Sequence, residues 1–458
     1  MLLPSTLVPT TRTGPETRPG QGNFPELLAL SPDASVPGSR ISGGNSVEPR
    51  DSRLLPTRIF CGSRKCFEIQ PRRPSSMVYP LIKRYDRNGY YKNDGRNCSS
   101  DIMSAQTVTF QRQSTEPASL IRIYRHDAVG AAPIPADSVL LKFLAAPVNP
   151  LDLLVIAGRY PVQPHHRYND EPIPGYDGVA RVERVGTDVE ALKPGDHVIP
   201  RAHGLGTWRT EAVVPAAAVL KVSKSLEPPT ASLLKTGCST AYLLLESCPS
   251  LCPGDWVVLN AATGWIARMV VQFALLKGCP SICVIRDRDD VEATRQSLLN
   301  QGARAVVTES QLAKEGPAEI AAGMRITLAL DAVFGQSGQR LAAMLAPGGT
   351  FINYGSLGGA GGQLVLSQEL IFWKQITFKN FRLSQALSRY TEDAQIDLLS
   401  WFTELFEEGK ITAPPVNRVD WEEDGDGGNL EKKVQSVLAR VGGKVRPAVG
   451  CTKHVVQF

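Results

Sequence analysis

Two short segments of the sequence carry side chains that could bind charged groups. Residues 204–210 read Gly-Leu-Gly-Thr-Trp-Arg-Thr, a glycine-punctuated loop that holds an aromatic ring and a cation. Further along, the triplet Arg286-Asp287-Arg288 follows an apolar stretch. Two guanidinium groups suit a doubly charged phosphate, because each offers planar, permanently charged and bidentate donors. The triplet therefore predicts a phosphate-bearing ligand at the end of a strand.

The segment before this triplet has the pattern of a dinucleotide-binding turn. Between an expected strand at 256–260 and an expected helix at 266–277, the chain reads Ala-x-x-Gly-x-x-Ala from Ala261 to Ala267. Small residues let the backbone approach a pyrophosphate at a helix N-terminus. Arg286 follows about 20 residues later, where an acidic residue is typical of NADH binding. The arginines favour the 2′-phosphate of NADPH; in the alternative, they only form ion pairs with Asp287 or Asp289 in a solvated loop.

Trp265 occupies a place in this turn where a small residue is usual. Two interpretations stay open from the sequence. The indole either points away into packing or narrows the pyrophosphate pocket.

Composition and charge describe an ordinary globular protein of two or three domains. Of the 458 residues, 42% are hydrophobic and 21% charged. Residues 1–100 hold 15 Lys and Arg against 8 Asp and Glu, whereas the remainder holds 35 against 37. This near-neutral remainder gives no sign of a nucleic-acid partner. No apolar run reaches the length of a membrane span, so we expect none.

Cysteine and histidine usage bears on metal and redox chemistry. The nine Cys are irregularly spaced, which predicts free thiols in a reducing compartment. With six His and no clustered ligands, we expect no metal site.

The chain divides into four expected parts. Residues 1–102 are rich in Ser, Pro, Gly and Arg and are read as a disordered leader or a transit-like extension. Residues 103–229 alternate short β-like runs with Gly/Pro turns, as in a β-barrel-like domain. Residues 230–384 alternate apolar strands with helices, the pattern of parallel βαβ units. Residues 385–458 hold a long helix and end in a strand-like tail.

Particular ranges are expected to form elements. The strands expected are 107–110, 139–143, 179–184, 197–199, 208–214, 256–260, 281–285, 305–308, 327–331, 350–354 and 454–458. The helices expected are 266–277, 291–301, 336–345 and 393–408. Two Pro-Gly-Asp turns, at 194–196 and 253–255, should lead into strands.

Several of these segments together resemble the medium-chain dehydrogenase/reductase superfamily, and within it the mitochondrial trans-2-enoyl-CoA/acyl-carrier-protein reductases. The matching segments span roughly residues 104–458 and are 148–152 (Val-Asn-Pro-Leu-Asp), 158–161 (Gly-Arg-Tyr-Pro), 204–210, 240–242 (Thr-Ala-Tyr), 286–288 and 354–355. The 204–210 and 286–288 strings are the specific ones.

The resemblance implies an α/β fold, in which a GroES-like, β-barrel-type catalytic domain is built from both chain ends around a doubly wound, parallel Rossmann sheet. It implies an enzyme in which NADPH delivers hydride to the β-carbon of a trans-2-enoyl-CoA or enoyl-acyl-carrier-protein in fatty acid synthesis. It also implies a homodimer and the mitochondrial matrix, or the cytoplasm if the extension is not a transit peptide. No zinc is expected, because residues 175–178 (Gly-Tyr-Asp-Gly) replace the ligands of zinc-dependent relatives.

The resemblance also assigns roles to individual residues. Tyr160 matches the acid that protonates the α-carbon, and a phenol is a reasonable acid toward a developing enolate; in the alternative, Tyr160 is an aromatic packed at a turn. The cofactor-binding residues implied are Thr263, Gly264, Trp265, Ile266, Arg286, Asp287, Arg288, Tyr354, Gly355, Ser356, Leu357, Phe381, Arg382, Leu383, Ser384 and Lys453. Their alternatives are strand-end turns, core packing and a solvated tail lysine.

Departures from the family pattern cluster around the expected cofactor and substrate. Gly237 replaces an Asn, Arg382 an aromatic residue and Ser356 a Gly, while residues 153–156 (Leu-Leu-Val-Ile) replace a more polar helix. They suggest a diverged paralogue, and two other functions therefore stay open. One is a quinone, enone or polyketide-pathway enoyl reductase. The other is a catalytically silent paralogue that acts as a binding protein.

Overall fold

The computed structural model describes residues 104–359, 361–421, 429–442 and 453–458. The chain divides into two units, Met1–Asn93 and Asp94–Phe458, and every described residue belongs to the second. The leader or transit-like extension expected at 1–102 lies outside the described residues.

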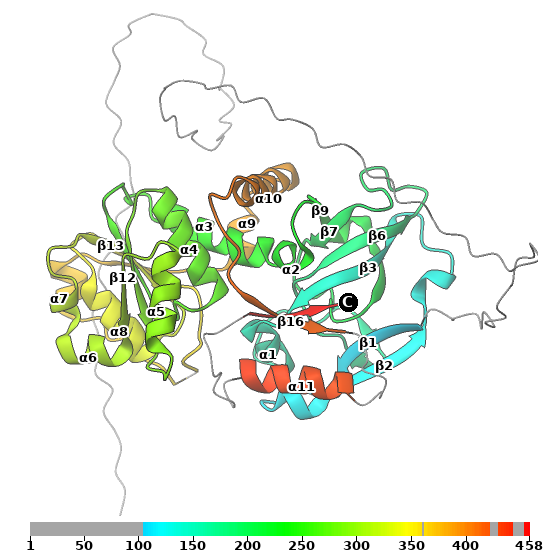
Figure 1. The fold of residues 1–458 in the computed structure, drawn as a ribbon, viewed down its shortest axis with the longest axis horizontal. Helices are drawn as coiled ribbons and strands as arrows, with labels where there is room; N and C mark the ends of the chain where they lie inside the picture. Colours follow the sequence, from blue (N-terminus) through cyan, green and yellow to red (C-terminus); the bar gives the residue numbers. More distant parts are fainter. Residues whose placement is uncertain (1–103, 360, 422–428, 443–452) are drawn as a thin grey trace, which may run out of the picture. The chain divides into compact units, whose positions relative to one another are not determined.

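A seven-stranded sheet is assembled from both ends of the described chain (Figure 1). Its order is β16-β17-β3-β6-β7-β9, and β8 pairs with β3. The last strand joins antiparallel to β3, with Val456 opposite Ala146. The strands are β3 (Ser138–Pro147), β6 (Val179–Val185), β7 (His197–Pro200), β8 (Glu211–Pro215), β9 (Val219–Val222), β16 (Val416–Asp420) and β17 (Lys453–Gln457).

Smaller elements pack around this sheet. The strands β1 (Ser104–Phe110) and β2 (Ile121–Asp127) form one antiparallel pair, and β4 (Arg167–Tyr168) and β5 (Glu171–Pro172) form another. The helices on this part are η1 (Pro117–Leu120), η2 (Val129–Ala131), α1 (Pro150–Ile156), η3 (Ala216–Ala218) and α11 (Asn429–Val441). Val434 and Leu438 of α11 are buried in a cluster with Ile156 and Phe110, which closes one face of the domain.

The second sheet is six-stranded, wholly parallel, and ordered β12-β11-β10-β13-β14-β15. The chain enters at the central strand β10 and reverses direction between β10 and β13, which is the doubly wound Rossmann order. Its strands are β10 (Trp256–Leu259), β11 (Ser281–Ile285), β12 (Ala305–Thr308), β13 (Ile326–Asp331), β14 (Thr350–Asn353) and β15 (Thr377–Asn380).

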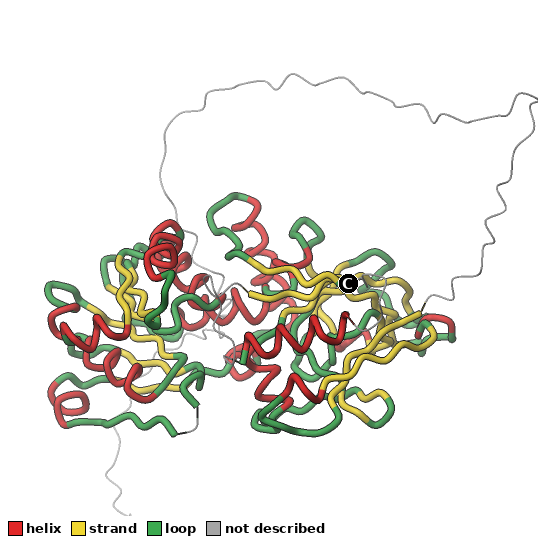
Figure 2. Tube along the Cα trace, turned by 60° about the horizontal axis from the view of Figure 1, so that its bottom comes forward, coloured by secondary structure: helices red, strands yellow, loops and turns green. Residues whose placement is uncertain are grey.

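Helices lie on both sides of the parallel strands (Figure 2). The helices of residues 228–407 are α2 (Pro228–Ala231), η4 (Leu234–Ser239), α3 (Thr240–Glu246), α4 (Trp265–Leu276), α5 (Val291–Asn300), α6 (Glu309–Glu315), α7 (Pro317–Ile320), α8 (Gly335–Met344), η5 (Glu369–Trp373), α9 (Leu383–Leu387) and α10 (Glu392–Glu407). Of these, α2 and α10 contact strands of the seven-stranded sheet. The strands β10, β11 and β13 are buried almost throughout, as expected of a parallel sheet covered on both faces. This arrangement confirms the α/β class.

The expected elements are largely present, most with bounds shifted by one residue. β1 begins three residues earlier than expected and β3 ends four residues later, whereas the strand expected at 208–214 is shortened, because β8 begins only at Glu211. Residues 208–210 form a buried loop instead, in which the Trp208 amide donates to the Pro174 carbonyl and the Trp208 carbonyl accepts from Val108. The sequence analysis missed the strands β2, β9, β15 and β16 and, among helices of seven residues or more, α1, α3, α6 and α11. Both Pro-Gly-Asp turns are present, with Gly195 and Gly254 at positive φ.

Candidate functional site

A buried carboxylate, Asp177, organises the polar residues at one end of the domain that is built on the seven-stranded sheet. Its two oxygens accept hydrogen bonds from Asn149 Nδ2 at 2.8 Å and Thr236 Oγ1 at 2.5 Å. Its carbonyl accepts from Thr207 Oγ1 at 2.6 Å. Only 2% of Asp177 is exposed. The carboxylate thus joins α1, the 204–210 loop and the π-helix η4, three segments that lie far apart in the sequence.

The last strand adds a partly buried cation to this cluster. Lys453 Nζ donates to the Val148 carbonyl at 2.9 Å and to Asn149 Oδ1. Burial lowers the pKa of Lys453 to about 8, against the opposing effects of Asp152 and Asp177. Burial also raises the pKa of Asp152 to about 7. Lys453 is therefore no solvated tail lysine; it ties the end of the chain to the start of α1.

Asp152 holds α1 in place at its N-terminus. Its Oδ2 accepts from the Asn149 amide at 2.7 Å, within a capping box in which Asn149 caps the helix in return. Pro150 occupies the first helical position, where a missing N–H costs nothing. The 148–152 string is thus a helix start that directs the Asn149 side chain toward Asp177.

Tyr160 lies in the loop after α1 and is half-buried. Its hydroxyl is 3.2 Å from His203 Nδ1, and its carbonyl accepts from Gln163 Nε2 at 2.6 Å. Its ring meets that of Tyr176 edge-on at 6.1 Å. Burial raises the pKa of Tyr160, the positive charge of Arg382 lowers it, and Asp177 raises it. The phenol is held at a turn, and its hydroxyl still reaches a polar environment.

Arg382, whose charge affects the pKa of Tyr160, lies just after the last strand of the parallel sheet. Phe381 follows β15 directly, and Arg382, Leu383 and Ser384 lead into α9. These residues stand beyond the carboxyl end of a Rossmann strand, which is where ligands of such sheets bind. The positive charge of Arg382 is also one of the charges that affect the pKa of Tyr160, which it lowers.

The expected dinucleotide turn forms between β10 and α4. The Gly264 amide donates to the Ala261 carbonyl at 2.9 Å, Ala261 adopts a positive φ of 47°, and α4 begins at Trp265. No acidic side chain lies in the first turn of α4, so its N-terminal amides and dipole favour an anion. Thr263 and Ile266 stand on either side of this start.

Trp265 is packed against Gly237. The indole is 7% exposed and belongs to the main hydrophobic cluster. A Cβ added at Gly237 would approach indole Nε1 and Cδ1 more closely than the 3.0 Å that real Cβ atoms respect. The indole therefore fills the volume that a side chain at 237 would need. Among the described residues, the buried Trp265 Nε1 has no hydrogen-bond partner.

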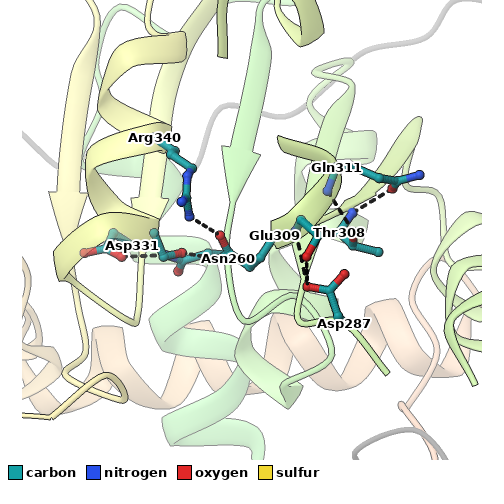
Figure 3. Close-up of polar contacts among 9 residues, drawn as sticks. Asn260, Asp287, Thr308, Glu309, Gln311, Asp331 and Arg340 are labelled. Carbon is teal, nitrogen blue, oxygen red and sulfur yellow. Dashed lines mark hydrogen bonds and ion pairs between the residues drawn. The ribbon is translucent and has the colours of Figure 1, made fainter. Parts of the chain in front are cut away.

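A polar network fixes the strand ends around this turn (Figure 3). Asn260 Nδ2 donates to Asp331 Oδ1 at 2.6 Å and to Ser337 Oγ at 2.9 Å. Asn353 Nδ2 donates to the second Asp331 oxygen at 2.8 Å, which couples β14 to β13. Arg340 pairs with Glu309 at 3.2 Å. Asn260 and Asp331 are fully buried, so this network holds the ends of β10, β13 and β14 together at the strand-order reversal.

The arginine triplet follows β11 at the same edge of the sheet. Arg288 pairs with Asp290 at 2.5 Å, rather than with Asp287 or Asp289. The Asp287 carboxylate, labelled in Figure 3, accepts hydrogen bonds from the Ser310 amide and hydroxyl at 3.2 and 2.8 Å. Arg286 is exposed, and none of the described residues forms a hydrogen bond or ion pair with its side chain. Of the two guanidinium groups, Arg286 is the one available to a phosphate.

The remaining expected cofactor residues follow β14. The Tyr354 amide donates to the Asp331 carbonyl, and the Leu357 amide donates to the Ala332 carbonyl, both at 2.9 Å. A Cβ at Gly355 would lie 2.8 Å from the Ala332 carbonyl, so this position requires glycine for packing. Ser356 is exposed, and so is Leu357 at 57%. The segment returns along the end of β13, next to the strand-order reversal.

The 204–210 loop is structural in this protein. Thr207 and Trp208 are buried, and Arg209 Nη2 donates to the Leu205 carbonyl at 2.9 Å. Burial lowers the pKa of Arg209 to about 10. The aromatic ring and the cation that stand out in the sequence therefore support the domain interior.

Sequence reasoning missed several polar residues of the site: His203, Thr236, Lys235 and, as a hub, Asp177. Asp177 stood in a segment noted only for its lack of zinc ligands. His203 directly precedes the glycine loop, but nothing in the sequence places it beside Tyr160. Lys235 Nζ donates to the Pro200 carbonyl at 2.5 Å, and burial lowers its pKa. A lysine that is buried in a π-helix follows no hydrophobic periodicity by which the sequence could reveal it.

Thiols and membrane spans can be assessed for the described part of the chain. There, Cys238, Cys248, Cys252, Cys279 and Cys283 are free thiols, as the spacing predicted. In the same ranges, no helix has the length and apolar character needed to cross a lipid bilayer.

Comparison with known proteins gives consistent matches. Residues 135–224 match the alcohol dehydrogenase GroES-like domain. The human mitochondrial enoyl-[acyl-carrier-protein] reductase is 35% identical over 305 residues, 66% of this chain and 79% of that protein. The mitochondrial 2-enoyl thioester reductase heterodimer of Candida tropicalis superimposes with a TM-score of 0.68 at 26% identity. A complex of Etr1p with NADP and crotonyl-CoA superimposes equally well at 25% identity. Both cover 78% of this chain and the whole of the matched chain.

Proposed function

The chain belongs to the mitochondrial enoyl-[acyl-carrier-protein] reductases of the medium-chain dehydrogenase/reductase superfamily and is an enoyl thioester reductase; from this premise, we propose that NADPH is its reductant and Tyr160 its proton donor. The reaction is the reduction of the 2,3 double bond of a trans-2-enoyl thioester. The observation that carries the assignment of the acid is the Tyr160 hydroxyl, half-buried and within the electrostatic reach of Arg382 at the carboxyl edge of the Rossmann sheet.

The residues present suit a dinucleotide phosphate. The start of α4 offers free amides without a competing acid, and Arg286 stands unpaired among the described residues after β11. Arg286 would hold the 2′-phosphate that distinguishes NADPH, with Arg288 joining if it leaves Asp290. Residues 354–357 and 381–384 would line the nicotinamide side. Lys453 would act indirectly, because its hydrogen bond holds the Asn149 side chain in place.

In the proposed mechanism, bound NADPH supplies the hydride that adds to the β-carbon. The Tyr160 hydroxyl gives its proton to the α-carbon. Burial raises the pKa of Tyr160, so the phenol is fully protonated at neutral pH and ready to act as an acid. The positive charge of Arg382 favours the phenolate that forms. Positioned acids of this kind typically contribute about 10²- to 10⁴-fold to the rate.

We propose a homodimer as the assembly. Ile371, Phe372 and Trp373 are exposed large apolar residues at the end of η5, and Phe372 and Trp373 are 62% and 65% exposed. The strand β15, whose residues are mostly exposed, forms the adjacent edge of the sheet. An apolar segment beside an open strand edge suits pairing with a second copy. The similar 2-enoyl thioester reductase of Candida tropicalis is an Etr1p/Etr2p heterodimer.

We also propose the mitochondrial matrix as the site of action. Its support is the mitochondrial naming of the relatives, together with the Arg-rich, acid-poor composition of residues 1–100. We likewise propose that the enoyl group reaches the enzyme as a thioester of CoA or of acyl-carrier protein.

The test is NADPH oxidation with trans-2-enoyl-CoA substrates of several chain lengths, for the wild type and Tyr160→Phe. We expect turnover that falls by about two orders of magnitude in the variant, because the acid is lost and the ring is kept. The matched control is Tyr168→Phe, since Tyr168 is a tyrosine of the same domain with rings of Tyr124 and His126 around it. Unchanged turnover in Tyr160→Phe would discard Tyr160 as the acid and leave the reductase intact.

A further inference from the structure

His203 lies against the hydroxyl group of the proposed acid. Its Nδ1 is 3.2 Å from the Tyr160 oxygen, and its ring stacks on Tyr176 with centroids 5.4 Å apart and planes 26° apart. Tyr176 is fully buried and its hydroxyl donates to the Val162 carbonyl. The surface on which the imidazole rests is therefore fixed, and on it Nδ1 lies toward the Tyr160 oxygen.

The charged groups near His203 are already engaged elsewhere. Asp177 accepts hydrogen bonds from Asn149 and Thr236, and Lys235 Nζ donates to the Pro200 carbonyl. The other histidine nearby is His165, whose ring would contact a Cβ placed at Gly204. Among the described residues, the only hydrogen bond of the His203 ring joins it to Tyr160.

The protonation of His203 sets the sense of this hydrogen bond. Burial lowers the pKa of His203, with Asp177 raising it and Lys235 lowering it further, so the imidazole is neutral at pH 7. A neutral imidazole has one donor and one acceptor nitrogen. An acid that must aim its own O–H at a substrate can receive a hydrogen bond only at its oxygen. Nδ1 of His203 is then the donor and Nε2 the acceptor.

We propose that His203 is a positioning residue for Tyr160, which donates from Nδ1 to the phenol oxygen and returns a proton to the phenolate after each turnover. This inference rests on the proposed function. When the α-carbon takes the phenol proton, the Nδ1–H group stabilises the phenolate. A solvent proton then adds to Nε2, the Nδ1–H bond breaks, and the phenol O–H bond forms again. The imidazole is then the Nε2–H tautomer. Loss of the Nε2 proton to water and gain of a water proton at Nδ1 restore the Nδ1–H donor before the next turnover, so water supplies the one proton consumed.

Two substitutions separate this role from simple packing. His203→Phe keeps a ring to stack on Tyr176 and removes both nitrogens. His203→Asn keeps a donor near the place of Nδ1 and removes the proton relay. The matched control is His126→Phe, because His126 also stacks on a tyrosine, Tyr168, with centroids 4.7 Å apart, and lies outside the site.

The first readout needs no substrate. The pKa of Tyr160 is measured from tyrosinate absorbance, as the difference between each protein and its Tyr160→Phe counterpart. We expect it to rise by about one to two units in His203→Phe, the size expected for losing a hydrogen bond to a charged oxygen, and to change little in His203→Asn or His126→Phe.

The second readout is the pH dependence of kcat with a trans-2-enoyl-CoA. We expect kcat to fall about 10- to 100-fold in His203→Phe with KM unchanged, and a partial recovery in His203→Asn. An unchanged Tyr160 pKa in His203→Phe would overturn the proposal; should that variant fail to fold, equal kcat in His203→Asn and wild type would overturn the relay. Failure of Tyr160 as the acid would show instead as full activity in Tyr160→Phe.

Discussion

At the scale of single residues, the same residue type has different roles in different surroundings. Arg209, Arg288 and Arg286 all stand in segments that identify the family. Arg209 is buried under its loop, Arg288 is held by Asp290, and only Arg286 is exposed without a partner in the described ranges. The sequence analysis assigned Arg286 and Arg288 alike to the cofactor phosphate, whereas their contacts distinguish them.

This ranking predicts the cofactor preference of two variants. Arg286→Ala should raise KM for NADPH about 10- to 100-fold, because a charge-assisted contact is worth roughly 1.5–3 kcal/mol. Arg288→Ala should have a smaller effect, because its guanidinium must first leave Asp290. Neither change should alter KM for NADH. Steady-state kinetics with both cofactors provides the measurement.

Arg304→Ala is the matched control, since Arg304 is an exposed arginine just before β12, at the opposite end of the strands. Equal losses with NADPH and NADH in Arg286→Ala would contradict the 2′-phosphate assignment.

At the scale of elements, η4 and α4 pack against one another where Gly237 meets the Trp265 indole. Gly237 stands where the family pattern has a polar Asn, and Trp265 stands where a small residue is usual. Taken separately, each departure looks like the loss of a cofactor-binding feature. In the structure, the indole occupies the space that glycine leaves. The two departures are one change in packing between two helices, which explains how the chain can carry both.

This contact predicts that substitutions at Gly237 and Trp265 have strongly non-additive effects on the free energy of unfolding. Gly237→Ala should destabilise the protein by about 1–3 kcal/mol through overpacking, because the indole is rigid and buried. Combined with Trp265→Leu, the same alanine should cost much less. Thermal unfolding of the single and double variants gives the coupling free energy, which we expect to exceed about 1 kcal/mol.

Gly361→Ala is the control, because a Cβ there would meet nothing within 4 Å. Additive effects of Gly237→Ala and Trp265→Leu would show that the contact does not constrain either position.

At the scale of the whole molecule, the chain leaves an apolar surface beside an open sheet edge. Val365, Leu366, Ile371, Phe372 and Trp373 are all about half or more exposed. They follow β14 and precede the edge strand β15. Large exposed side chains concentrated in one short segment are typical of a surface that another chain covers.

The homodimer proposal predicts the effect of changing this surface. The double variant Phe372→Ser and Trp373→Ser should sediment as a monomer at concentrations where the wild type is a dimer, because two large apolar contacts per subunit are lost. Leu275→Ser is the control, since Leu275 is 55% exposed on α4 and outside this segment. A wild type that stays monomeric, or a variant that stays dimeric, would contradict the proposed interface.

The sequence alone determined the features that depend on local patterns. Period, turn residues and small-residue spacing predicted β10, α4, β11 and the turn between them, because a parallel strand and its helix are encoded within some tens of residues. Two family strings likewise pointed to Tyr160 and to Arg286. The missed strand β15 is short and mostly exposed, so it has no apolar run to reveal it.

Only the tertiary structure decided which residues meet. Asp177 joins Asn149 and Thr236, Lys453 reaches back across the domain to Asn149, and His203 touches Tyr160. Each pair is brought together by strand pairing and by burial between distant segments. A local pattern cannot encode such contacts, because their free energy comes from removing both partners from water at one place in the folded chain.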